Sequence, residues 1–227
     1  MFGPDPINFF DPSPYGALAY YGHYLFGTVV LLASLIALIV KKGRGTHRTA
    51  GLVFIFGTAL LSLTSVSMLI DRFIPPLMMA VVSSVCAIGG AYLALQKPMK
   101  WVRTGEYALT LAQAVGLAVF LSIAIPEAAA GRIPVVAPIV IAVIPLILLA
   151  GDALWYARSS QRQRYRIARH LSRMIWGFVI VLRAPMVEIA AAGVPIPVPV
   201  TIIGPILLAF AMLAYFLLRY APSSKGV

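Results

Sequence analysis

The chain of 227 residues is 61% hydrophobic and only 11% charged, with a mean hydropathy of +0.93. This composition excludes an ordinary soluble domain, because so apolar a surface would aggregate in water. The net charge of +11 would fit a nucleic-acid-binding protein. The basic residues, however, lie in short segments beside long apolar runs, where membrane topology and anionic head groups account for them. We therefore expect a membrane protein with no nucleic-acid partner.

Seven apolar runs are each long enough to cross a bilayer as a helix, which takes about 20 residues. In chain order they are Gly16–Val40, Arg48–Ile70, Pro75–Gln96, Gly105–Ile125, Pro134–Ala157, Leu171–Ala192 and Val200–Leu218. No polar segment between them is long enough to form a second domain, although the basic segment Arg158–His170 is a candidate helical extension. The sequence therefore predicts a single all-α polytopic transmembrane bundle of about seven helices over residues 1–227.

The basic residues also predict an orientation. Fifteen of the 18 Lys and Arg residues lie in or beside the segments that follow the first, third, fifth and seventh runs. The other side holds four acidic residues: Asp5, Asp11, Asp71 and Glu127. By the positive-inside rule the basic side is cytoplasmic, which places the N-terminus outside and the C-terminus in the cytoplasm. We expect a multi-pass protein of a bacterial inner membrane, with anionic lipids around its cytoplasmic face.

Three polar residues within the runs are costly in a bilayer and are therefore candidate functional residues. Arg183 lies near the middle of the sixth run, where an arginine costs about 2.5–3.5 kcal/mol on insertion scales. Glu188 follows five residues later, so the two side chains would meet only if Pro185 distorts the helix. Either a buried ion pair or an anion or proton site would explain them. His23 lies in the outer part of the first run, near Ser and Thr residues of the second.

Two other histidines share a context that favours a ligand site. His47 and His170 each follow a basic segment and open a run that leads outward from the cytoplasmic side. The positive end of a helix dipole and neighbouring cations disfavour a second proton on imidazole, and neutral imidazole is the form that binds zinc or haem iron. Asp152 approaches the same depth on the fifth run, as a third ligand or as the acceptor that fixes a histidine tautomer. The alternative is that these histidines bind only lipid phosphate or helix ends.

The histidines and their neighbours also resemble a protein family. The chain has His23, then Lys41-Lys42-Gly43-Arg44-Gly45-Thr46-His47-Arg48-Thr49-Ala50-Gly51, and later Arg169-His170-Leu171-Ser172-Arg173-Met174. This pattern is similar to an uncharacterised bacterial family of polytopic membrane proteins with a first-helix His, a His-Arg-x-x-Gly and a later His-x-x-x-Met. The resemblance covers the first, second and sixth runs, and departs from the family at Arg173, where an aromatic is usual. It implies that the three histidines are a shared polar signature, without an established reaction.

These observations leave three functions open, and no commitment on whether the protein is an enzyme. The seventh run has no Lys for a retinal Schiff base, and no Walker loop, HExxH or GxSxG motif is present. We favour a haem- or metal-binding redox or sensor protein that holds haem b or zinc at His47 and His170. The alternatives are a small transporter or proton-linked carrier that uses His23, Arg183 and Glu188, and an accessory or scaffold subunit of a larger membrane complex.

Overall fold

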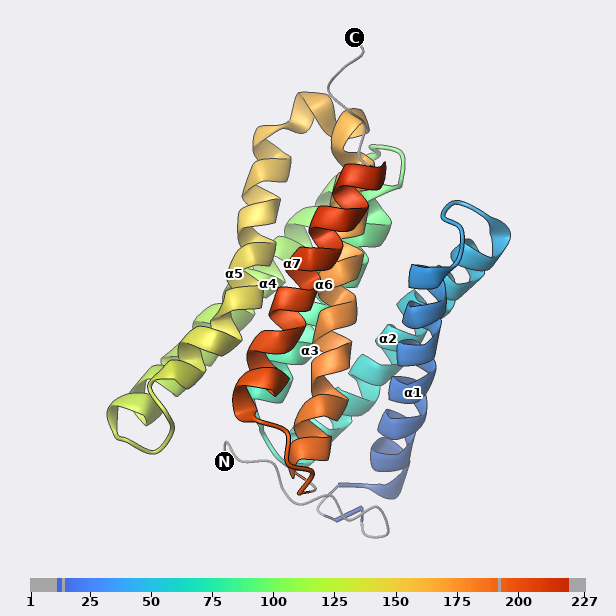
Figure 1. Cartoon of the computed structure of the whole chain (residues 1–227). Coiled ribbons are helices and arrows are strands. Elements are labelled where there is room, and N and C mark those ends of the chain that lie inside the picture. The colour runs from blue at the N-terminus through green and yellow to red at the C-terminus, as the bar shows by residue number, and fades with distance from the viewer. Residues whose placement is uncertain (1–11, 14, 192, 221–227) are drawn as a thin grey trace.

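The computed structural model of the chain describes residues 12–13, 15–191 and 193–220 and has seven α-helices (Figure 1). Their bounds are α1 Ala17–Ile39, α2 Gly45–Asp71, α3 Pro75–Ala94, α4 Lys100–Ala129, α5 Val136–Ala157, α6 Arg162–Ala191 and α7 Val198–Tyr220, with a short 3₁₀ turn, η1 Ser159–Gln161, before α6. This confirms the predicted all-α bundle of seven helices. Asp5, Asp11 and Lys225, which contributed to the predicted orientation, lie outside the described residues.

Six of the described helices, all except α6, are long and apolar enough to cross a membrane. Helix α6 differs because it begins at Arg162, nine residues before the predicted sixth run, and its first half is basic. The part of the basic segment from Arg162 to His170 is therefore the first part of α6, as expected for a helical extension. The protein is a multi-pass membrane protein in which α6 is the most polar helix.

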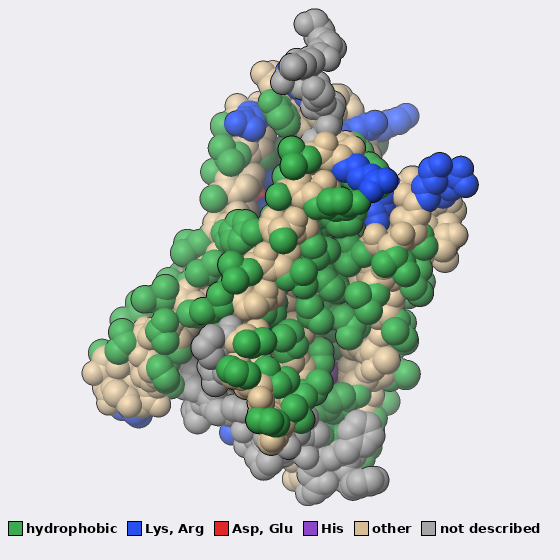
Figure 2. Space-filling view, in the orientation of Figure 1, with side chains coloured by type: hydrophobic (Ala, Val, Ile, Leu, Met, Phe, Trp, Pro, Cys, Tyr) green, Lys and Arg blue, Asp and Glu red, His purple; other side chains and the backbone are tan. Residues whose placement is uncertain are grey.

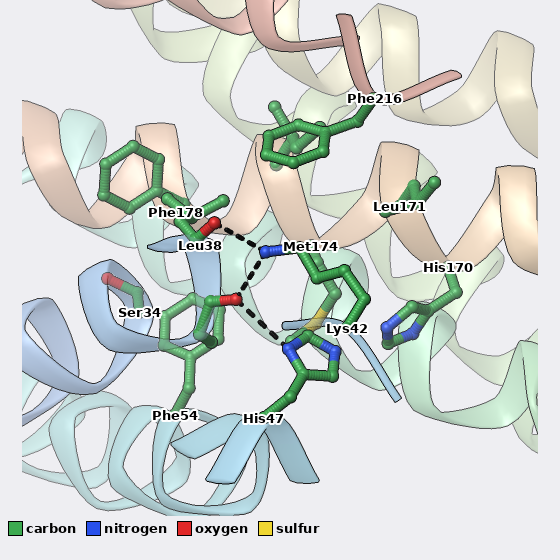
Figure 3. Close-up of a pocket in the computed structure, with 12 residues that line it drawn as sticks. Ser34, Leu38, Lys42, His47, Phe54, His170, Leu171, Met174, Phe178 and Phe216 are labelled. Atoms are coloured by element: carbon green, nitrogen blue, oxygen red, sulfur yellow. Dashed lines mark hydrogen bonds between the residues drawn. The ribbon is translucent and has the colours of Figure 1, made fainter. Parts of the chain in front are cut away.

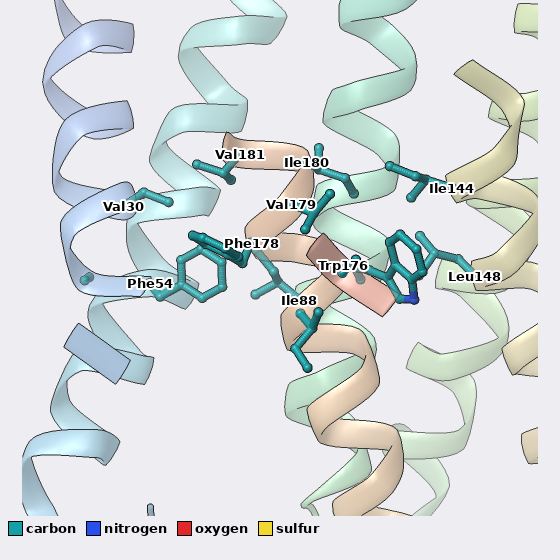
Figure 4. Close-up of a cluster of buried hydrophobic side chains, with 14 residues drawn as sticks. Val30, Phe54, Ile88, Ile144, Leu148, Trp176, Phe178, Val179, Ile180 and Val181 are labelled. Carbon is teal, nitrogen blue, oxygen red and sulfur yellow. The ribbon is translucent and has the colours of Figure 1, made fainter. Parts of the chain in front are cut away.

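Helix α6 lies in the centre of the bundle and packs against α1, α3, α5 and α7 (Figure 1). Buried apolar side chains from α6 and from five other helices form one core (Figure 4). Its labelled members are Val30, Phe54, Ile88, Ile144, Leu148, Trp176, Phe178, Val179, Ile180 and Val181. Helix association in a bilayer depends on close packing rather than on removal of apolar surface from water, so this core joins α6 to its neighbours.

A glycine sets the distance between α6 and α3. A Cβ atom built on Gly177 would lie 2.7 Å from Cγ1 of Ile88, closer than real Cβ contacts allow. Only glycine lets the two backbones approach this closely. The close approach brings α3 carbonyls within reach of polar side chains on α6.

Lys and Arg side chains gather at one end of the molecule, toward the top of the view (Figure 2). We call this the basic end; it contains the α1–α2 and α3–α4 connections, the α5–α6 connection and the last turn of α7. Helix α1 begins at the other end, and α7 ends at the basic end (Figure 1). The charge separation on which the predicted orientation depends is thus present in three dimensions.

Candidate functional site

The structure places His47 and His170 in one cavity at the basic end, which we call the histidine pocket (Figure 3). The pocket has a volume of about 50 Å³ and lies between α1, α2, α6 and α7. Its lining residues are Ser34, Ala37, Leu38, Lys42, His47, Phe54, His170, Leu171, Met174, Ile175, Phe178 and Phe216. Two histidines that are 123 positions apart in the sequence therefore line the same small space.

Both imidazoles are held in the same way. Nδ1 of His47 lies 3.1 Å from the carbonyl oxygen of Ala37 in α1, and Nδ1 of His170 lies 3.1 Å from that of Ala91 in α3. A carbonyl only accepts hydrogen bonds, so in the neutral ring Nδ1 carries the hydrogen and Nε2 has the lone pair. Within the described part of the chain, neither Nε2 has a hydrogen-bond partner. This is the arrangement found where Nε2 binds a metal and a second group fixes the ring.

The local sequence explains how His47 reaches the end of α1. Gly43 has a φ of +77°, a left-handed conformation that glycine adopts without strain. The chain therefore reverses within a few residues, and the first turn of α2 lies beside the last turns of α1. Because His47 is the third residue of α2, its side chain faces Ala37 across this tight connection.

Met174 and Lys42 complete the polar and polarisable groups of the pocket. Met174 is four residues after His170, so the two side chains share one face of α6, and Met174 lines the same pocket as both histidines (Figure 3). Nζ of Lys42 donates to the carbonyls of Ala37 at 2.7 Å and Leu38 at 2.6 Å, which caps the C-terminal end of α1. Partial burial lowers the pKa of the Lys42 ammonium. The pocket thus offers two imidazoles and one thioether beside one capped cation.

Asp152 does not join these histidines. It is absent from the lining of the histidine pocket, and its carboxylate instead binds Arg169 and Arg173 of α6 and accepts a 3.0 Å hydrogen bond from Thr110 of α4. The described residues contain no cluster of three or more His, Cys, Asp and Glu side chains that could hold a metal ion. The structure therefore brings together two of the three predicted ligands and places the third between α4, α5 and α6.

Asp152 belongs to a buried network that we call the ionic cluster. Its members are Glu106, Thr110, Asp152, Trp155, Tyr156, Arg162, Arg169 and Arg173. Glu106 is 2% exposed and accepts from Trp155 Nε1 at 2.9 Å and from Arg162 at 2.6 Å. Arg173 also donates to the carbonyls of Cys86 and Leu148, and so joins α3 to α5. Every carboxylate oxygen in the cluster has a protein donor, so the cluster ties four helices together.

Of the residues in this cluster, only Asp152 was predicted from the sequence to have a functional role. Glu106 lies inside an apolar run, four residues before Thr110, and its acidic side chain there was the available signal. Arg169 and Arg173 looked like solvated residues of a basic connection, but they are 9% and 3% exposed. Their spacing of four residues, on a helix that continues into the bundle, places both on one buried face.

The three remaining polar candidates lie nearer the opposite end and are not gathered into one site. His23 Nδ1 lies 3.2 Å from Ser65 Oγ of α2, as expected for a partner on the second span. Among the described residues, no ion pair joins Arg183 to Glu188, and no hydrogen bond joins either of them to His23. The arrangement gives no support to a continuous polar path through these three residues.

Comparisons with known proteins add no further constraint. No family model matches the chain, and no characterised protein or solved structure is significantly similar to it.

Proposed function

We propose that this protein binds one transition-metal ion between His47 and His170 at the basic end of the bundle and acts as a redox or sensor protein. The observation that carries the proposal is the pair of imidazoles that line one cavity, each with Nδ1 fixed by a carbonyl and Nε2 without a partner. If the basic end is cytoplasmic, as the positive-inside rule predicts, the metal site faces the cytoplasmic side of an inner membrane.

The size of the pocket distinguishes a metal ion from a haem. Sites for cofactors and drug-sized ligands typically have volumes of about 300–1,000 Å³, whereas the histidine pocket has about 50 Å³. A haem does not fit between the histidines as they are placed. The pocket does have room for one ion and a few waters, each of which needs about 10–15 Å³ by this measure.

The ligand types favour copper(I) over zinc. Zinc sites use at least three protein ligands, which are His, Cys or a carboxylate, and Asp152 is bound elsewhere. Copper(I) takes imidazole and the soft sulfur of methionine, and Met174 is the sulfur-containing residue among those that line the pocket with the two histidines (Figure 3). Copper(I) also carries a single charge, so its repulsion by the Lys42 ammonium is half that of a divalent ion.

The test is to load the detergent-purified protein with copper(I) under reducing, oxygen-free conditions and to measure bound copper per chain after removal of the excess. We expect one copper ion per chain, lost in both His47→Ala and His170→Ala. His23→Ala is the matched control, because it removes the third histidine at the opposite end and should leave the stoichiometry unchanged. Binding should weaken as the pH is lowered, because protons then compete with the metal for imidazole.

Two outcomes would contradict the proposal. Copper retained in full by either pocket variant would show that these histidines are not the ligands, and an equal loss in His23→Ala would show a non-specific effect. An absorption spectrum of the purified protein belongs to the same experiment. A Soret band that disappears in both pocket variants would identify a haem instead and would require the helices around the pocket to separate.

A further inference from the structure

A second cavity lies at the basic end, between α5 and α6, and we call it the arginine groove. It has a volume of about 150 Å³, three times that of the histidine pocket. It is lined by Ile147, Leu148, Gly151, Leu154, Trp155, Arg158, Tyr165, Ala168, Arg169, Ser172, Arg173 and Trp176. The proposed metal site does not use this groove, so the inference that follows is independent of the proposed function.

Two buried N–H donors on the wall of the groove have no acceptor. Trp176 is 1% exposed, and its indole Nε1 has no hydrogen-bond partner within the part of the chain that the structure describes. Arg169 is 9% exposed, and its Nε has none either. In Figure 4 the indole nitrogen of Trp176 points to the side where Leu148 of α5 lies. Leaving a buried donor unsatisfied is costly, so these two donors point to an acceptor that is not part of the described chain.

The charges beside the groove are unequal. Three guanidinium groups of the ionic cluster, on Arg162, Arg169 and Arg173, face only two carboxylates, on Glu106 and Asp152. Every oxygen of both carboxylates already accepts a hydrogen bond within the protein. The buried cluster therefore has an excess positive charge, which is unfavourable without a further anion.

The mouth of the groove adds one more cation. Arg158 is exposed at the end of α5, and its guanidinium lies 5.0 Å from the centre of the Tyr165 ring. No ion pair is recorded for Arg158 among the described residues. The positive charge of the groove thus increases toward the level at which lipid head groups lie.

The other end of the groove is apolar and open to lipid. From Arg158 to Ile147 the groove follows α5 for about 16 Å, at about 1.5 Å per residue. Leu154 is 56% exposed and Ile147 is half-buried, so this wall faces the acyl chains of the bilayer. A ligand that fits has an anionic group at the arginine end and a hydrocarbon chain at the other.

We propose that the arginine groove binds an anionic phospholipid, with the phosphate near Arg158 and Arg169 and an ester carbonyl, deeper in the groove, near the indole N–H of Trp176. One acyl chain would then follow Ile147, Leu148 and Leu154. A phosphodiester supplies several strong acceptors and a negative charge, which match the unpaired donors and the excess cation. A volume of about 150 Å³ holds one group about the size of a benzene ring, which is enough for the phosphate while the chain remains in the bilayer.

The test titrates the purified full-length protein in detergent with phosphatidylglycerol or phosphatidylcholine and counts retained lipids by native mass spectrometry. We expect a saturable phosphatidylglycerol site whose apparent Kd rises at least about tenfold in Arg158→Gln, because this change removes a charge-assisted hydrogen bond to the phosphate. Trp176→Phe keeps the ring, removes the N–H donor and should raise the Kd in the same direction. Both changes leave the ionic cluster intact, and circular dichroism checks that the variants fold.

Arg164→Gln is the matched control. Arg164 also lies near the Tyr165 ring, at 5.8 Å, but it does not line the groove. Its removal should raise the Kd by about fivefold at most, because only the general attraction of one charge to an anionic surface is lost. Equal effects of Arg158→Gln and Arg164→Gln would overturn the proposal in favour of diffuse charge attraction. So would equal affinity for the two lipids, or displacement of phosphatidylglycerol by millimolar inorganic phosphate, which would identify a site for free phosphate.

Discussion

The histidine pocket and the arginine groove lie on different faces of the same helix, and their unpaired polar groups are of opposite kinds. The pocket has two imidazole Nε2 lone pairs without a donor, whereas the groove has buried N–H donors without an acceptor. A lone pair binds a cation or a proton, and an N–H group binds an anion. Polar groups in a bilayer are costly, so what each region leaves unpaired indicates the class of ligand better than what it contains.

The two regions are separated by a single step along α6. Arg169 and Arg173 are four residues apart and face the ionic cluster, and His170 and Met174, each one residue later, face the histidine pocket. One residue rotates a side chain by about 100° around the helix axis. Two interleaved pairs with the same spacing therefore produce two chemically different surfaces.

The largest expected effect comes from Asp152→Asn, which tests whether Asp152 serves only the ionic cluster. The change leaves Arg169 and Arg173 buried without a charged partner, which should lower the free energy of unfolding by about 3–5 kcal/mol. Denaturant titration in mixed micelles measures the loss. The folded fraction should still bind one copper ion per chain. If it does not, Asp152 is a metal ligand after all, and the pocket and the ionic cluster are not separate.

A matched control for this variant is Glu127→Gln. Glu127 pairs with Arg132 at the opposite end, where the Arg132 side chain is 61% exposed. Exposed ion pairs contribute little to stability, so the control variant should unfold at the same denaturant concentration as the wild type.

Gly177→Ala should disturb both regions together. The new Cβ would collide with Ile88 and push α3 away from α6, close to both the pocket and the groove. Overpacking of this kind typically costs about 1–3 kcal/mol of stability. Thermal unfolding and copper affinity should both decline. Gly51→Ala is the control, since no atom lies within 4 Å of its Cβ position, and alanine there should stabilise α2 by about 0.5–1 kcal/mol.

Met174→Leu tests whether the Met174 sulfur is a metal ligand, because the change removes the sulfur and keeps the side-chain volume. Copper(I) affinity should fall about tenfold, as expected for loss of one soft ligand, and zinc affinity should change little. Competition with a colorimetric chelator gives both constants. Equal losses for the two metals would mean that Met174 acts through packing alone.

Lys42→Met should change copper affinity in the other direction. Removing a positive charge from the pocket lining should raise affinity about threefold, since a cation near the site repels the metal across a partly solvated gap. The same chelator titration measures it. A fall in affinity would show that the Lys42 bonds to α1 matter more to His47 than its charge does.

The smallest effect is expected for Ser65→Ala, which removes the hydrogen-bond partner of His23 at the opposite end. Interhelical hydrogen bonds of this kind contribute about 0.6 kcal/mol on average. Unfolding should shift slightly, with no change in copper or lipid binding. A loss of either ligand would connect His23 to the basic end and contradict the separation described above.

Much of the fold could be predicted from the sequence because a bilayer imposes its thickness on every helix. The second predicted run, Arg48–Ile70, and helix α2, Gly45–Asp71, differ by three residues or fewer at each end. The predicted sixth run began nine residues late, since hydropathy detects the membrane and not the helix, and α6 extends beyond its apolar part as a basic helix.

The candidate site could be predicted only in part. The shared depth of His47 and His170 follows from topology, and the structure places them together. Depth does not give the rotation of a helix about its axis, and this is why Asp152, at a similar depth, faces a different cluster. Glu106 was missed for a related reason, because its partners Trp155 and Arg162 come from later helices and no spacing rule connects them to it.

The position of His47 also has a mechanical consequence. Helices α1 and α2 form a hairpin that stands to one side of the other five helices in Figure 1. His47 belongs to this hairpin, whereas His170 and Met174 belong to the main body, so the histidine pocket lies at the junction between the two. An ion bound by all three would link the hairpin to the main body, and its binding free energy would stabilise the packing of the hairpin against the rest of the protein.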